Sequence, residues 1–145
     1  MDYQSAFAIS AAGMSAEKLR VDIAALNLAN ANSPLSAKGA GYQPLRVQAS
    51  MRAVPGARSF EALMDHGMSA TQTLSVAPYR APPRRVHEPG HPQANKDGFV
   101  LYPGVDSLTE MVTLMVASRA YEADVAAFNA AKSMAVKALE IGGRS

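Results

Sequence analysis

Two long stretches of the chain repeat apolar residues at the spacing of an α-helix, one near each end. From about residue 5 to residue 30 the sequence is rich in Ala and Leu and contains no proline. Apolar residues recur there with alternating steps of three and four, which keeps them on one side of a helix: Ile9, Ala12, Ala16, Leu19, Ile23 and Leu26. A second apolar row lies on a different side: Phe7, Met14, Val21 and Leu28. The run then meets Pro34, so we expect the helix to end near Asn30.

The C-terminal stretch predicts a longer helix, from about Ser107 to Ile141. Asp106 or Ser107 can serve as its N-cap, and Glu110 stands at capping-box spacing from Ser107. One row, interrupted by Asp124, consists of Leu114, Ala117, Tyr121, Asp124, Phe128, Ala131, Ala135 and Ala138. Another consists almost entirely of small residues: Val112, Val116, Ala120, Ala123, Ala127, Ala130 and Met134. Such a helix would be about 50 Å long, too long for a compact domain of this size.

The residues between the helices follow a different pattern. Alternation of apolar and polar residues from Leu45 to Ala53 predicts a half-buried strand, and residues 68–76 suggest a second one. Residues 59–67, which begin with Ser and end with Gly, are typical of a single helical turn. Residues 78–104 contain six prolines, which predicts an extended, punctuated connection.

These elements predict a mainly α fold with a small β insertion. The N- and C-terminal helices, in residues 1–34 and 105–145, pack as a coiled-coil stem. Residues 35–104 form a small β-containing outer domain and a proline-rich linker. Because each helix is apolar on more than one face, two helices alone cannot cover all of their apolar surface. We therefore expect the chain to be part of an oligomer or a polymer.

Composition narrows the possibilities further. The chain has 145 residues and a net charge of +2. Only 6% of its residues are aromatic, so each buried side chain covers little area and contributes little free energy to the stability of the core. It contains no cysteine, which excludes disulfides and cysteine-bound zinc. The only basic cluster, Arg80, Arg84 and Arg85, lies among prolines without an aromatic platform, so we expect no nucleic-acid partner. We also expect no cleaved signal peptide and no membrane insertion.

One short motif resembles a zinc-peptidase signature. His87-Glu88-Pro89-Gly90-His91 has the spacing H-E-x-x-H, which brings two imidazoles to one metal when the segment is helical. Pro89 and Gly90 disfavour a helix, at costs of about 3 and about 1 kcal/mol, so the segment predicts a turn. His66, beside Asp65 and Gly67, is typical of a surface turn. No residues point to a catalytic site, a cofactor or a small-molecule substrate, and we expect no enzyme.

The amino-acid sequence of both ends resembles the bacterial flagellar basal-body rod protein family, and most closely the members that form the proximal rod. The segments that carry the resemblance are residues 26–33, 88–92, 97–100, 103–106, 110–112, 117–125, 129–134 and 137–142. They include Leu-Asn-Leu-Ala-Asn-Ala-Asn-Ser at 26–33 and Ala-Ser-Arg-Ala-Tyr-Glu-Ala-Asp-Val at 117–125. The chain departs from the family pattern at Gly104 and Asp124, where Asn is more usual.

The resemblance implies a structural subunit that polymerises into the rod, crosses the periplasm, transmits torque and encloses the export channel. It implies export through the flagellar type III apparatus, and as partners FlgB, FliE, FlgF and further copies of the chain. The alternatives are another rod or hook protein of the same family, or a stand-alone helical adaptor. We expect the assembly interface to consist of Ile9, Ala12, Ala16, Leu19, Ile23, Leu26, Asn30, Met111, Leu114, Tyr121, Ala123, Ala127, Phe128, Met134 and Leu139.

Overall fold

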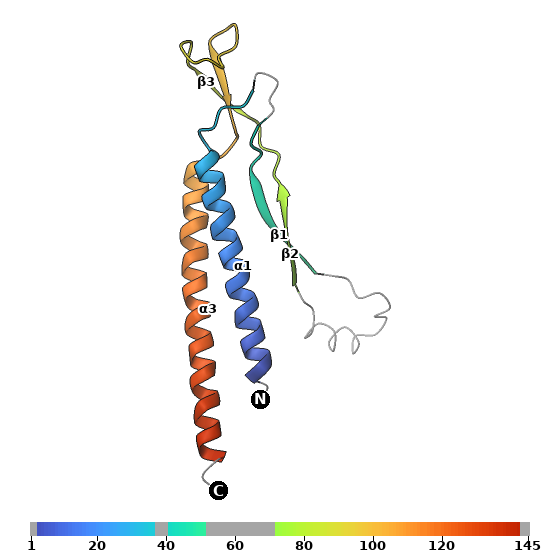
Figure 1. Ribbon diagram of the computed structural model, residues 1–145, viewed down its shortest axis with the longest axis vertical. Coiled ribbons are helices and arrows are strands. Elements are labelled where there is room, and N and C mark those ends of the chain that lie inside the picture. The colour runs from blue at the N-terminus through green and yellow to red at the C-terminus, as the bar shows by residue number, and fades with distance from the viewer. Residues whose placement is uncertain (1–2, 37–40, 52–71, 143–145) are drawn as a thin grey trace, which may run out of the picture.

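The computed structural model describes residues 3–36, 41–51 and 72–142, and two long helices dominate it (Figure 1). Helix α1 covers Tyr3–Asn30 and helix α3 covers Ser107–Gly142. They lie side by side and run in opposite directions, and the C-terminal end of α3 extends beyond the start of α1 (Figure 1). Both predicted helices are therefore confirmed, together with the mainly α fold.

The ends of the helices follow from local sequence. Helix α1 stops at Asn30, whose side-chain amide donates to the carbonyl of Leu26 at 2.9 Å, and a turn precedes Pro34. At the start of α3, the Asp106 carboxylate accepts hydrogen bonds from the backbone of Leu108 and the hydroxyl of Thr109. These bonds lower the pKa of Asp106, the Thr109 bond most strongly. Asp106 is therefore the N-cap.

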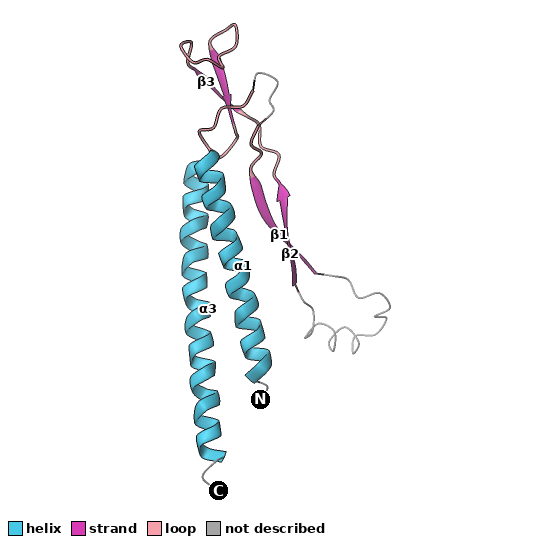
Figure 2. Ribbon diagram, viewed as in Figure 1, coloured by secondary structure: helices cyan, strands magenta, loops and turns pink. Residues whose placement is uncertain are grey.

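Two antiparallel strand pairs make up the β part of the described residues (Figure 2). Strand β1, Leu45–Met51, pairs with β2, Gln72–Pro78, so that Leu45 lies opposite Pro78. This confirms the first predicted strand through residue 51 and the second from residue 72. The helical turn predicted at 59–67, with His66, falls outside the described residues, as do 52–53 and 68–71.

The second strand pair corrects the sequence interpretation of residues 78–104. Strand β3, Arg84–His87, pairs with β4, Phe99–Tyr102, where we predicted an extended connection. The prolines do not prevent this pairing because they flank the two four-residue strands rather than interrupt them. Gly98, with φ of +75°, turns the chain into β4.

The core is small and lies where the strands join the helices. Its buried apolar residues on β4 and on the segment that pairs with it are Val100, Tyr102 and Leu35. Leu35 joins β4 through a backbone bond to Leu101 of 2.7 Å. In the described residues, the buried part of the helix pair consists of Ala24, Asn27, Ala117 and Ala131, and Ala31, directly after α1, is also buried.

Asn27 fixes β1 on α1. Its side chain is 1% exposed, and its Oδ1 accepts hydrogen bonds from Leu45 N at 2.9 Å and from the Tyr42 hydroxyl at 2.7 Å. Its Nδ2 donates to the Leu45 carbonyl at 2.9 Å. The amide thus pairs with the backbone of Leu45 much as a neighbouring strand would, and it satisfies every polar group involved.

Candidate assembly surface

One apolar row of α3 packs against α1 and holds the helix pair together. Ala117 and Ala131 from this row are 1% and 6% exposed, and the ring centroid of Phe128 lies 5.1 Å from that of Phe7 on α1. The α1 row that contains Phe7 therefore faces α3, and its other members are half-buried: Met14, Val21 and Leu28. Leu114 and Phe128, predicted as assembly residues, lie half-buried in this contact within the chain.

Asp124 interrupts this row without preventing close packing. A Cβ added at Gly13 would lie only 2.6 Å from Oδ2 of Asp124. The aspartate therefore occupies space that any other residue at position 13 would fill. Among the described residues, no cation forms an ion pair with its carboxylate.

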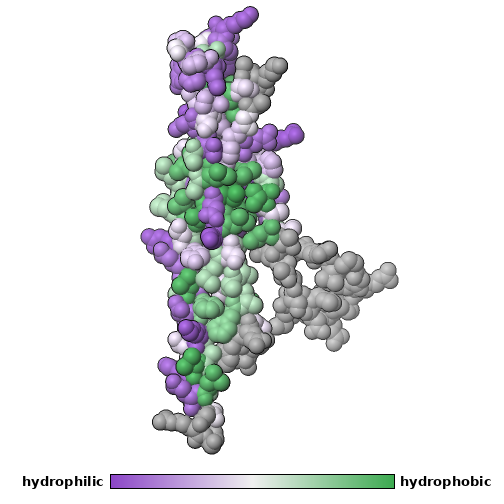
Figure 3. Space-filling model, viewed as in Figure 1, coloured by the Kyte–Doolittle hydropathy of each residue, from purple (hydrophilic) through white to green (hydrophobic). Residues whose placement is uncertain are grey.

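The other row of α3 faces away from α1 and is exposed. Val112, Val116 and Met134 are 46%, 62% and 56% exposed. Ala123, Ala127 and Ala130 are also exposed, whereas Ala120 is half-buried. We call these seven residues the outer α3 face. Leu108, Met111 and Met115, which are 71%, 51% and 59% exposed, extend it near the start of the helix. Hydrophobic residues spread along the visible side of the helices, while hydrophilic ones gather at the end with β3 and β4 (Figure 3).

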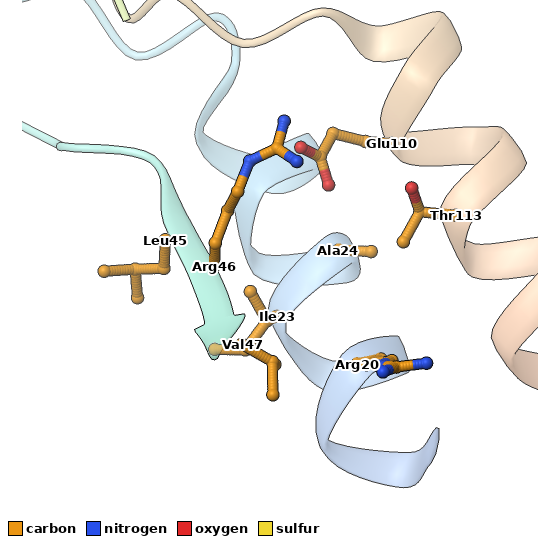
Figure 4. Close-up of a pocket in the computed structure, with 8 residues that line it drawn as sticks. All are labelled: Arg20, Ile23, Ala24, Leu45, Arg46, Val47, Glu110 and Thr113. Atoms are coloured by element: carbon orange, nitrogen blue, oxygen red, sulfur yellow. The ribbon is translucent and has the colours of Figure 1, made fainter. Parts of the chain in front are cut away.

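The predicted apolar row of α1 is divided between exposed and covered residues. Ile9 and Leu26 are 73% and 43% exposed, and Ala12 is also exposed. Ala16, Leu19 and Ile23 are half-buried. Ile23 lies beside Val47 of β1 at a small cavity of about 120 Å³ (Figure 4). The strand pair therefore covers part of this row.

Charged side chains border the same cavity. Figure 4 shows Arg46 of β1 and Glu110 of α3 pointing toward one another, with Arg20 of α1 on the other side of the cavity. Arg20 pairs with Glu17 at 2.9 Å. Burial raises the pKa of Tyr42, and the negative charge of Glu110 raises it further. Glu110 thus lies in the junction of β1 with the two helices.

The remaining predicted residues lie apart from one another. Tyr121 is 39% exposed and borders a groove of about 520 Å³ between α1 and α3, together with Lys18 and Val21. Asn30 is half-buried at the end of α1. At the far end of α3, Leu139 is 76% exposed, and so is Ile141, which was not among the predicted assembly residues. Ala131 is the last buried residue of α3.

The histidine motif forms the predicted turn, and His87 before it ends a strand that was not predicted. His87 is the last residue of β3, and the His91 amide donates to the Glu88 carbonyl at 3.1 Å. Glu88 accepts a hydrogen bond from the Tyr102 hydroxyl at 3.0 Å, which raises the pKa of Tyr102. Within residues 3–36, 41–51 and 72–142, no three His, Asp or Glu side chains gather as metal ligands would. No helix in this part of the chain has an apolar stretch long enough to span a bilayer.

The sequence of the chain is similar to those of flagellar basal-body rod proteins. Residues 96–141 match the family described as "Flagellar basal body rod FlgEFG protein C-terminal". The chain is 37% identical over 136 residues to the flagellar basal-body rod protein FlgC of Escherichia coli O6:H1, covering 94% of this chain and 95% of that protein. It is 36% identical to FlgC of Salmonella typhimurium, with the same coverage. Identity to FlgC of Bacillus subtilis is 34%, covering 92% of this chain and 94% of that one.

Proposed function

Because this chain belongs to the FlgC family of flagellar basal-body rod proteins, and so is a structural subunit of the rod, we propose that its helices are the surface through which rod subunits hold one another. The observation that carries the proposal is the outer α3 face. Six of its seven residues are exposed, and large ones such as Val116 are more than half exposed. A helix that is apolar on two faces is stable in water when both faces are covered.

The composition of this face suits a contact that transmits mechanical force between subunits. Ala123, Ala127 and Ala130 are small, so the backbone of a neighbouring helix approaches closely and the interface packs at the density of a protein interior. Displacing one subunit relative to the next then distorts many contacts at once. In this proposal torque passes between subunits through such close-packed helices.

Residues 1–34 and 105–145 are the packed stem in this proposal, with the two helices in coiled-coil contact. Residues 35–104 form the outward-facing domain. The neighbours are further copies of the chain and the rod proteins FlgB, FliE and FlgF. The assembled stems enclose the export channel where the rod crosses the periplasm, and the chain reaches this place through the flagellar type III apparatus.

The assembly residues of this proposal are the exposed members of the predicted set. They are Ile9, Ala12, Leu26, Met111, Tyr121, Ala123, Ala127, Met134 and Leu139. The half-buried members support them from inside the chain: Ala16, Leu19, Ile23, Leu114 and Phe128. Asn30 ends helix α1, which carries Ile9, Ala12 and Leu26.

A reconstruction of isolated basal bodies tests the proposal directly. We expect the density of this chain to show α1 and α3 in the inner wall of the rod, with Ala123 and Ala127 against a helix of another subunit. Density in which the outer α3 face points into solvent, or in which the chain is absent from the rod, would overturn the proposal.

A further inference from the structure

Methionine supplies the most easily oxidised groups of this chain. The sequence contains no cysteine and no tryptophan, but it contains eight methionines. Thiols react readily with peroxides, and in their absence the thioether sulfur of methionine becomes the preferred target. The positions of the methionines therefore decide which surface of the protein an oxidant changes.

Three methionines lie on the surface proposed for assembly. Met134 belongs to the outer α3 face, and Met111 and Met115 extend this face near the start of the helix. The exposed fractions of Met111, Met115 and Met134 are 51%, 59% and 56%. Met14, by contrast, is half-buried in the α1 row that faces α3. An oxidant in solution thus reaches three of the four methionines whose burial the structure describes.

Oxidation changes the chemistry of these side chains and leaves the backbone intact. The thioether sulfur takes one oxygen atom from hydrogen peroxide. An S–O bond forms, the O–O bond breaks, and the second oxygen leaves as water with both protons. The sulfur loses two electrons and the peroxide gains them. The product, methionine sulfoxide, is polar, whereas methionine is a flexible apolar residue.

A sulfoxide weakens the packed contact that we propose for this face. The residues around the three methionines on this face are apolar, among them Val112, Val116 and Ala127, and their side chains offer no hydrogen-bond donor. A buried acceptor without a donor makes a contact roughly 5- to 150-fold weaker. In the free chain, water hydrates the sulfoxide oxygen. The modification therefore acts on assembly and leaves the fold of α3 unchanged.

We propose that Met111, Met115 and Met134 are an oxidation site for peroxides, and that their sulfoxide forms keep the chain out of the rod. The inference rests on the proposed function and adds a means of regulating the same surface. Oxidation is confined to the unassembled chain, because the contact between subunits covers the three sulfur atoms. Methionine sulfoxide reductases reverse the step, so an oxidised chain regains its ability to assemble.

Peptide mass spectrometry of the purified full-length chain tests the site. During timed exposure to hydrogen peroxide, we expect sulfoxide to form at Met111, Met115 and Met134 at least about threefold faster than at Met14, because susceptibility follows exposure. Circular dichroism of the oxidised chain should match that of the untreated chain. Equal rates at all four positions would overturn the proposed site.

Induced expression of the chain in sublethal hydrogen peroxide tests the effect on assembly. The wild type should yield fewer basal bodies, with sulfoxide in the unassembled chain but not in isolated rods. The triple variant carries Met111→Leu, Met115→Leu and Met134→Leu, since leucine has a similar volume and no sulfur. Its yield should fall less than that of the wild type. The matched control Met14→Leu should lose as much yield as the wild type.

The outcomes separate this inference from the proposed function. If peroxide lowers the yield of the triple variant and of the wild type equally, the oxidation inference is wrong and the proposed function is unaffected. If the chain is missing from the rod even without peroxide, the proposed function itself fails. Where the triple variant assembles poorly without peroxide, the wild-type fractions decide. Sulfoxide as abundant in rods as in the unassembled chain would overturn the inference.

Discussion

Replacing Ala127 by leucine separates assembly from folding. Ala127 is exposed on α3 and lies outside the contact with α1. Leucine is nearly as good a helix former as alanine, so the unassembled chain should change in stability by less than about 0.5 kcal/mol. In the rod, the added carbons must fit into a close-packed contact, at a cost of typically about 1–3 kcal/mol per subunit. That corresponds to roughly a 5- to 150-fold weaker contact.

Swimming in soft agar and the yield of intact basal bodies measure the effect, and circular dichroism of the purified chain measures folding. The control for assembly is Ala49→Leu, at an exposed position on β1, which should leave swimming unchanged. The control for folding is Ala117→Leu, at a site 1% exposed against α1, which should lower the helix content. Normal swimming with Ala127→Leu would refute a packed outer α3 face. So would a folding defect as large as that of Ala117→Leu.

Three further substitutions test the fold beneath this surface. Asn27→Ala leaves the backbone of Leu45 in β1 without its hydrogen-bond partner and should lower the free energy of unfolding by about 2–3 kcal/mol. The control Asn30→Ala removes one local hydrogen bond and should lower it by less than about 0.5 kcal/mol. Equal amide-exchange protection of β1 in both variants would contradict this. Gly104→Ala places a Cβ against the Pro82 carbonyl oxygen, so we expect the free energy of unfolding in urea to fall by about 1–3 kcal/mol. An unchanged midpoint would show that the loop adjusts. The lowered pKa of Asp106 stabilises the start of α3 above pH 3.8, and this contribution disappears as the pH falls through the folded-state value. Circular dichroism should show this acid loss in the wild type but not in Asp106→Asn.

The two helices were predictable from sequence because their signals are local. Proline-free apolar repeats predict the extent of both helices. Pro34 limits α1 at its C-terminal end, and Asp106 is one of the two N-caps predicted for α3. The turn in the histidine motif was predictable for the same reason, since Pro89 and Gly90 act on their own backbone. These predictions required no knowledge of what lies nearby in space.

The β3–β4 pair and the role of Asn27 were not predictable in this way. The strands have four residues each and lie among prolines, so their periodicity is too short to recognise. Asn27 belongs to an asparagine-rich segment that carries part of the family resemblance and shows no local signal of a partner. Its partners, Tyr42 and Leu45, lie 15 and 18 residues away, and only folding brings them together.

That each helix has two apolar sides follows from the order of the residues, because the helical repeat is a property of the chain alone. Which side faces inward depended on the tertiary structure. The contact of Phe7 with Phe128 turns one row of each helix inward, β1 covers part of another near Ile23, and the outer α3 face is left for other subunits. Periodicity specifies how many faces a helix has, whereas burial depends on which surfaces the rest of the chain can reach.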